Sequence, residues 1–358
     1  MGGTTSSYAG RRYRRARRLR HQPRGVVAVI GTLLALLVFF ALFGIFLTQY
    51  VPVWMTDNEA YFTAQAAASM AQLKASIDAQ YALGGPATYG TPFTLSSGSV
   101  PLIAQPTLGT LTFVPNTCPY GFFNPVNTPT SSPKAPFYGQ PRVPGFCVFV
   151  NVTESNGPGG TAKYSQAVAS GVIQFILPNR YYTPETFYME DDAVLQSQSS
   201  GFQIMAVPPP LNFTVIPGNT TVSDSFVQLY GNASTVVGQG SEDVYSHLRY
   251  STVVTSNGHL QGGVQQPLNF TFTIGTQWPC AWNTYLYHVL TTSGLASGNV
   301  SFSTSFDNNT TTPIQATWPL SCINNNGATT ILSFQVRGVT YATLWQAGLG
   351  IGIGVGAD

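Results

Sequence analysis

Charged side chains are scarce in this chain of 358 residues, because Asp, Glu, Lys and Arg together make up only 8% of it. A typical soluble domain carries about 25%. Aromatic residues nevertheless reach 13%, whereas disordered chains are highly charged and poor in aromatics. The composition therefore excludes disorder for most of the length. The size allows one large domain or two ordinary ones, either with a substantial core.

The few charges are unevenly distributed. Residues 1–49 contain eight Arg and no acidic residue, while residues 50–358 contain seven Lys or Arg and thirteen Asp or Glu. A basic patch on a folded domain would suggest nucleic acid as a partner. Here the bulk is mildly acidic and the basic block is a short terminal segment, so no nucleic-acid binding is expected.

Catalytic motifs are also lacking. The sequence has four His and contains no HExxH, GxSxG or P-loop motif. Glu185 and the run Glu190-Asp191-Asp192 form the one acidic cluster, which could bind Ca²⁺ or supply a glycosidase pair. No EF-hand spacing is present, so we expect a solvated turn beside a strand. We predict no catalytic, cofactor-binding or metal site, and no enzyme.

A long apolar run follows the Arg block. Val26 to Leu47 are 22 residues without a charge, which as a helix would span roughly 33 Å, enough for a bilayer core of about 30 Å. The run is longer than the apolar part of a cleaved secretory signal. We predict a transmembrane helix over 26–48, with the Arg-rich leader 1–25 in the cytoplasm and the bulk outside the cell.

The junction between the Arg block and the apolar run adds a family resemblance. Arg24-Gly25 is followed directly by Val26 and then Val-Ala-Val-Ile-Gly-Thr. This resembles the class III signal of archaeal type IV pilins, in which a peptidase cuts after Gly on the cytoplasmic side and the helix is retained. The resemblance implies cleavage between Gly25 and Val26 and packing with like subunits in a filament. A plain uncleaved anchor explains the same residues.

A second helix is expected after the anchor, as a stalk over 49–84. Thr56 and Glu59 have the spacing of a capping box, and Pro52 should break or kink the junction. An apolar stripe recurs at three- and four-residue steps, and the opposite face is assigned Gln, Ser and Lys. The stripe consists of Phe62, Ala66, Met70, Leu73, Ile77 and Tyr81.

Residues 85–358 have the texture of an antiparallel β-sandwich, either one region or two lobes at about 85–160 and 161–358. Short runs rich in Val, Ile, Phe and Thr alternate with Gly, Pro, Asn and Ser. One helix is predicted at 278–290, and a Pro-rich loop at 115–144. The closing glycines from Gly348 alternate with Leu349, Ile351, Ile353 and Val355. Their bare face either simply backs a core strand or accepts aromatic rings or a neighbouring subunit.

The order of features beyond Tyr164 also carries a resemblance. A strand leads to Tyr181-Tyr182, then to the acidic run, to Pro208-Pro209-Pro210, to a Trp-containing helix and to a closing strand pair. This order is similar to that in archaeal pilin-associated envelope proteins. The resemblance implies a surface or envelope role, and no known activity.

Cysteines and sequons agree with an exported region. Four Cys suggest two disulfides, with sequence proximity favouring Cys118–Cys147 and Cys280–Cys322 among three connectivities. Eight N-x-S/T sequons lie beyond the apolar run, as in an exported glycoprotein. They are at Asn151, Asn212, Asn219, Asn232, Asn269, Asn299, Asn308 and Asn309.

Together these features predict a membrane-anchored α+β surface glycoprotein, pilin-like at its N-terminus, with a structural or adhesive function. Its expected partners are the lipid bilayer, like subunits or other pilins, and surface glycans or neighbouring cells. Two alternatives stay open: a surface-tethered carbohydrate-active enzyme and a minor component of a pilus or secretion machine. The scarcity of charge suggests an acidic habitat, where carboxylates lose their pairing value.

Overall fold

The computed structural model describes residues 24–85, 87–99, 104–115, 146–154, 162–258, 260–261, 264–295, 299–306 and 330–354. The chain divides into two compact units, residues 1–52 and 53–358. The expected loop at 115–144 lies almost entirely outside the described residues.

The N-terminal unit is helical. Helix α1 (Arg24–Ile45) runs into a π-helical turn η1 (Phe46–Tyr50), and helix α2 (Val51–Leu83) follows without a break. Pro52 was expected to break or kink the junction, and the break is wrong, although the hydrogen-bond pattern does change just before the proline. In the π-turn the N–H of Val51 donates to the carbonyl of Phe46, five residues earlier. A wider turn before proline relieves the clash between its ring and the preceding carbonyls. Within the described residues, Val27–Leu83 is long and apolar enough to cross a membrane.

Helix α2 is built into the core of the second unit. The predicted stripe is confirmed: Phe62, Ala66, Met70, Leu73 and Ile77 are at most 2% exposed. Two other expectations are wrong. Thr56 and Glu59 lie inside the helix and form no capping box, because the helix begins upstream of them. Lys74, assigned to the polar face, is only 6% exposed.

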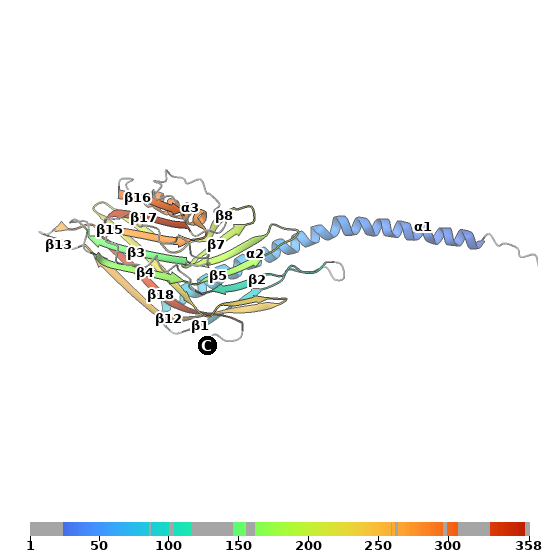
Figure 1. Ribbon diagram of the computed structural model, residues 1–358, viewed down its shortest axis with the longest axis horizontal. Coiled ribbons are helices and arrows are strands. Elements are labelled where there is room, and N and C mark those ends of the chain that lie inside the picture. The colour runs from blue at the N-terminus through green and yellow to red at the C-terminus, as the bar shows by residue number, and fades with distance from the viewer. Residues whose placement is uncertain are drawn as a thin grey trace, which may run out of the picture. The chain divides into compact units, whose positions relative to one another are not determined.

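The remaining described chain is mostly β, in three large sheets (Figure 1). The first sheet has the order β1 (Thr88–Thr94), β12 (Ser241–Asn257), β18 (Tyr341–Ile353), β10 (Asn219–Tyr230), β9 (Asn212–Ile216). The second has β11 (Ser234–Val237), β2 (Thr110–Val114), β5 (Val172–Leu177), β6 (Glu185–Glu190), β7 (Ala193–Gln198), β8 (Gln203–Val207). The third has β16 (Val300–Phe306), β17 (Thr330–Val339), β15 (Leu268–Thr276), β3 (Phe146–Glu154), β4 (Ala162–Ser170). A small hairpin joins β13 (Leu260–Gln261) to β14 (Val264–Gln265).

The expected antiparallel pairing is found throughout the described sheets, except that β10 and β18 run parallel. Strands β1, β2 and β3 precede residue 161 and pair with β12, β5 and β15, which follow it. Residues 53–358 accordingly form one compact unit rather than two lobes. The sequence analysis missed β1, β6, β7, β9, β11 and the β13–β14 hairpin, all of them short strands of at most seven residues.

The first sheet contributes to two hydrophobic cores. On β10, Val222 and Phe226 belong to one cluster, whereas Val227 and Leu229 belong to the other. Odd and even positions of a strand point to opposite faces, so the two clusters lie on opposite sides of the sheet. We call the first the α3 core, because it contains α3 (Pro279–Thr292), and the second the α2 core.

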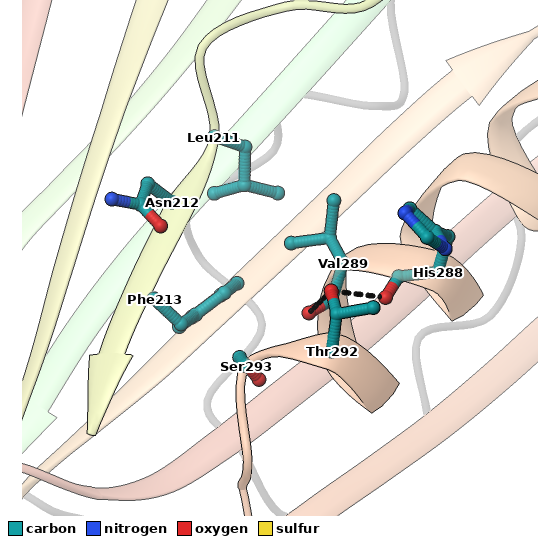
Figure 2. A pocket seen from close by; sticks show the side chains of 7 residues that line it. All are labelled: Leu211, Asn212, Phe213, His288, Val289, Thr292 and Ser293. Atoms are coloured by element: carbon teal, nitrogen blue, oxygen red, sulfur yellow. Dashed lines mark hydrogen bonds between the residues drawn. The ribbon is translucent and has the colours of Figure 1, made fainter.

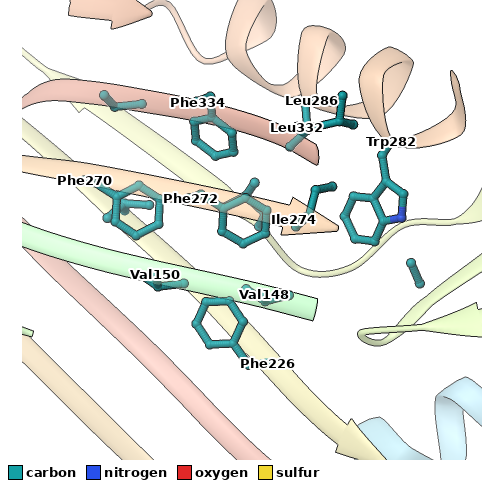
Figure 3. Close-up of a cluster of buried hydrophobic side chains, with 14 of the residues drawn as sticks. Val148, Val150, Phe226, Phe270, Phe272, Ile274, Trp282, Leu286, Leu332 and Phe334 are labelled. Atoms are coloured by element: carbon teal, nitrogen blue, oxygen red, sulfur yellow. The ribbon is translucent and has the colours of Figure 1, made fainter. Parts of the chain in front are cut away.

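The α3 core is dominated by aromatic rings (Figure 3). Phe272 of β15 lies between Phe334 of β17 at 5.1 Å and Phe226 of β10 at 6.1 Å, measured between ring centroids. The helix predicted at 278–290 is confirmed as α3, and its residues Trp282 and Leu286 are fully buried. The Trp282 ring stacks on Phe146 of β3 at 5.4 Å. Such pairs add to the stabilisation from burial.

Candidate functional site

The predicted processing junction lies at the start of α1. Arg24 is the first residue of the helix, and Gly25 and Val26 continue it. Residues 1–23 of the Arg-rich leader lie outside the described residues. Helix α1 and the following π-turn η1 together contain the whole apolar run, so cleavage after Gly25 would leave that run intact.

The sequons differ in accessibility. Those at Asn212, Asn219, Asn232 and Asn299 are exposed. Asn151 and Asn269 are half-buried on the central strands β3 and β15, and their side-chain oxygens have no hydrogen-bond partner among the described residues. Asn308 and Asn309 lie outside the described residues. The exposed four are the better candidates for carrying glycans.

Of the predicted disulfide cysteines, Cys147 is disulfide-bonded. It lies on β3, and Cys280 is buried at the beginning of α3. Cys118 and Cys322 lie outside the described residues, so the two favoured pairings remain predictions.

A pocket of about 300 Å³ opens between β9 and the end of α3 (Figure 2). Thr292 donates a hydrogen bond of 2.7 Å to the carbonyl of His288 in its wall. The lining found among the described residues contains no carboxylate, and therefore no acid and base pair of the kind that glycoside hydrolysis needs. It consists of Leu211, Asn212, Phe213, His288, Val289, Thr292 and Ser293.

The acidic cluster is the least expected feature of the structure. It does form a turn, but the prediction of a solvated turn is wrong: Glu185, Glu190, Asp191 and Asp192 are all at most 3% exposed. Asp191 and Asp192 join β6 to β7 and have φ values of 44° and 61°. Positive φ at both central residues is the geometry of a two-residue type I′ hairpin, which Asp tolerates better than most residues.

Each carboxyl of this turn has a distinct set of partners. Glu190 Oε2 accepts hydrogen bonds from Thr276 Oγ1 at 2.8 Å and Trp282 Nε1 at 3.2 Å. Asp191 Oδ1 accepts from the backbone N–H of Val227 at 3.1 Å. The turn is therefore tied to β15, α3 and β10.

Asp192 binds the helix α2. Its Oδ2 lies 3.0 Å from Lys74 Nζ, which also lies 2.8 Å from Asp78 Oδ2. Both ion pairs of the described residues thus use the same ammonium. Asp224 on β10 adds a further buried carboxyl near Asp191, with Oδ2 lacking a described hydrogen-bond partner.

Burial controls the ionisation of these groups. It raises the pKa of Glu190 to about 7, although the hydrogen bonds from Thr276 and Trp282 oppose the rise. Burial, joined by the repulsion of Asp224, raises the pKa of Asp191 well above its ordinary value. Burial likewise raises the pKa of Asp192 against the attraction of Lys74. Lys74 opposes the rise of the pKa for Asp191 and Asp192, but for Glu190, Asp191, Asp192 and Asp224 alike burial outweighs the opposing interactions and favours the protonated form.

Glu59 of α2 is also buried, but its pKa is shifted in the opposite direction. Its oxygens accept hydrogen bonds from Thr107 Oγ1 and from three consecutive backbone N–H groups, those of Arg180, Tyr181 and Tyr182. Burial alone would raise the pKa of Glu59, but these hydrogen bonds outweigh it and lower the pKa. Such an arrangement of donors is typical of an anion-binding loop; here the anion is the protein's own carboxylate.

Strand β18 contains most of the closing glycines, and both of its faces make packing contacts. Leu349 and Ile351 are buried in the α2 core, as a core strand requires. The opposite face also has a use, because a Cβ on Gly348 would overlap the ring of Tyr250 from β12. Both interpretations of this segment are therefore correct in part: it closes a core and it accepts an aromatic ring.

Several residues of these clusters escaped the sequence analysis. Lys74 falls between Met70 and Ile77 at helical spacing, on the apolar stripe, and that position was the signal for a buried cation. Asp224 stands in a β-rich run with no pattern to mark it. No group of three or more His, Cys, Asp or Glu side chains among the described residues could hold a metal ion.

No protein-family model matches this chain, and no curated protein or solved structure matches it either.

Proposed function

We propose that this chain is a surface protein of the cell envelope, held by one membrane helix and serving a structural or adhesive function. The observation that carries the proposal is the direct succession of α1 and α2. An apolar helix of transmembrane length continues into a helix that forms part of the core of the β unit. An anchor that continues into a domain core suits a protein whose anchor must bear load.

The contacts of α2 support this use. Glu59 near its beginning is bound by the loop at 180–182, and Lys74 near its end binds the β6–β7 turn. The stripe between them is fully buried. A force applied along α2 is therefore resisted at two polar attachment points and along one apolar face.

The N-terminal sequence favours a pilin-like origin of this anchor. The Arg-Gly-Val junction and the retained helix fit processing by the archaeal class III route, and like subunits are the proposed neighbours in the membrane or in a filament. The bulk of the chain, with its disulfide at Cys147 and its exposed sequons, is proposed to face the medium.

N-terminal analysis of the mature protein from membranes tests the processing. A chain that starts at Val26 supports the pilin-like proposal, whereas a chain that keeps the Arg block is a simple anchor. Alkaline washing of membranes and protease treatment of intact cells test the anchoring and its direction. Release by the wash, or protection of residues 53–358 from external protease, would contradict the proposed topology.

A further inference from the structure

Lys74, Asp78 and Asp192 form a group in which one amine contacts two carboxyls. Lys74 Nζ lies 3.0 Å from Asp192 Oδ2 and 2.8 Å from Asp78 Oδ2. The side chain of Lys74 is 7% exposed, that of Asp192 is 0% exposed and that of Asp78 is 38% exposed. The Asp192 side of this group is therefore closed to solvent, whereas the Asp78 side is open to it.

The ion pair between Lys74 and Asp192 leaves one oxygen of the Asp192 carboxyl without a hydrogen bond to any described residue. Asp192 Oδ1 is buried and has no hydrogen-bond partner among the described residues. Asp191, next in the chain and also buried, is close enough to Lys74 for the ammonium to oppose the rise of its pKa, and the buried Asp224 lies near Asp191. Burial disfavours the ammonium of Lys74, but Asp192 and Asp78 outweigh it and raise the pKa of Lys74, so the ammonium has to pass a proton to a neighbour before it can react. Burying a charged pair is nonetheless costly unless every lone pair and proton is satisfied, and an amide of the same two groups avoids that cost.

Two neutral arrangements are available to an amine and a carboxyl in contact. One is an uncharged amine beside a carboxylic acid, and the other is the amide that the two form by losing water. In bulk water the amine is protonated, and this prevents amide formation because an ammonium has no lone pair with which to attack. Exclusion of water from Asp192 destabilises the two charges and so weakens that protection.

We propose that Lys74 and Asp192 condense into an intramolecular isopeptide bond that ties helix α2 to the β6–β7 turn. Asp78 accepts one proton from the Lys74 ammonium, and the Nζ lone pair attacks Cγ of the protonated Asp192 carboxyl. A C–N bond forms and a C–O bond breaks. Of the other two ammonium protons, one stays on the amide, and one leaves in the water together with the Asp192 hydroxyl. Nothing is oxidised or reduced.

The geometry suits each part of this step. Lys74 Nζ lies 3.0 Å from Asp192 Oδ2, which is bonded to the Cγ that it would attack. A small displacement would bring the two reacting atoms to the distance of about 3–3.5 Å that defines a near-attack arrangement. Asp192 is fixed by a tight turn with φ of 61°, and Lys74 by the buried face of α2. Asp78, four residues further along the same helix, is open enough to solvent for the released water to leave.

The amide would also explain the position of Lys74 within an apolar stripe. It removes the buried charges of both partners, and Asp78 keeps a hydrogen bond by accepting from the new N–H or donating to its carbonyl. The bond would connect α2, which continues into the membrane helix, covalently to the second sheet. Load on the anchor would then reach the sheet without depending on side-chain packing.

Mass spectrometry of the full-length chain tests the proposal. The protein is produced in a host that adds no N-glycans, extracted in detergent, denatured and reduced. We expect an intact mass lower than that of the linear chain by one water, and after trypsin a branched peptide joining Lys74 to Asp192 with no cleavage at Lys74. Lys74→Arg keeps the cation but cannot form this amide, and should give the linear mass.

Two further variants locate the bond and its proton acceptor. Asp192→Asn should still link, but with loss of one ammonia instead of one water. Asp78→Asn should lower the linked fraction at a fixed time after synthesis. A wild-type chain of linear mass that trypsin cuts at Lys74 would overturn the proposal, whether or not the variants fold. A water loss confined to a peptide joining Lys74 to Asp78 would overturn the assignment to Asp192.

Discussion

Replacing Glu190 by glutamine will flatten the pH dependence of the folding stability of this protein. Glu190 is 1% exposed, and its Oε2 accepts hydrogen bonds from Thr276 and Trp282. Burial raises its pKa from 4.5 to about 7. Glutamine has a carbonyl oxygen that can accept the same two hydrogen bonds and carries no charge at any pH.

The sign of the effect follows from the raised pKa. Below the pKa of the unfolded chain both states are protonated and the wild type loses nothing. As the pH rises from about 4.5 to 7, the unfolded chain releases the proton while the folded chain retains it, so the free energy of unfolding falls. At about 1.4 kcal/mol for each unit of pKa difference, Glu190 removes about 3 kcal/mol by pH 7. That is a large share of the 5–15 kcal/mol typical of a domain.

Urea unfolding of the full-length chain in detergent, followed by tryptophan fluorescence at several pH values, measures this loss. Asp192 and Asp224 are present in both chains and should cancel in the difference, whereas Asp191, whose pKa Glu190 helps to raise, loses that contribution in the variant. Glu242→Gln, the same change on a half-buried strand position, is the matched control and should shift stability by less than about 0.5 kcal/mol. Parallel curves for wild type and Glu190→Gln between pH 4.5 and 7.5 would refute the reasoning.

The same unfolding assay checks three other substitutions. Glu59→Gln replaces a carboxylate bound by three backbone N–H groups and should cost about 2 kcal/mol at neutral pH. Because the pKa of Glu59 is lowered in the folded protein, the stability lost in the variant should shrink as the pH falls through that pKa. An equal loss at low pH would contradict the binding of the ionised carboxylate by these N–H groups. Gly348→Ala should destabilise by about 2 kcal/mol through overlap with Tyr250, and adding Tyr250→Ala should recover most of it, whereas additive losses would exclude the overlap. Trp282→Ala removes a fully buried ring and should cost about 3–5 kcal/mol; a loss below 1 kcal/mol would mean that the ring is not part of the core.

The sequence predicted those parts of the fold in which apolar periodicity is strong. The stripe from Phe62 to Ile77, the helix around Trp282 and the Val- and Phe-rich strands β3 and β15 were all predicted from spacing. Their side chains belong to the two hydrophobic cores, and burial of apolar surface is the main favourable term in folding.

The polar parts of the fold could not be predicted in the same way. Two adjacent Asp residues indicate a turn, and the turn exists, but hairpin tips are normally at the surface and nothing local reveals that α2 and β10 cover this one. Glu59 fits a capping box, yet its partners are the N–H groups of residues 180–182, more than a hundred positions away. Helix continuity past Pro52 depends on a π-turn that has no sequence signature.

The two cores are not independent, because β10 and β18 supply side chains to each of them from opposite faces. Ala342 and Leu344 of β18 face the α3 core, while Leu349 and Ile351 face the α2 core. Unfolding of either core would displace β10 and β18, whose opposite faces pack in the other core. A destabilising change in the α2 core should therefore also affect the packing around Trp282, and residues 53–358 should unfold as a single cooperative unit.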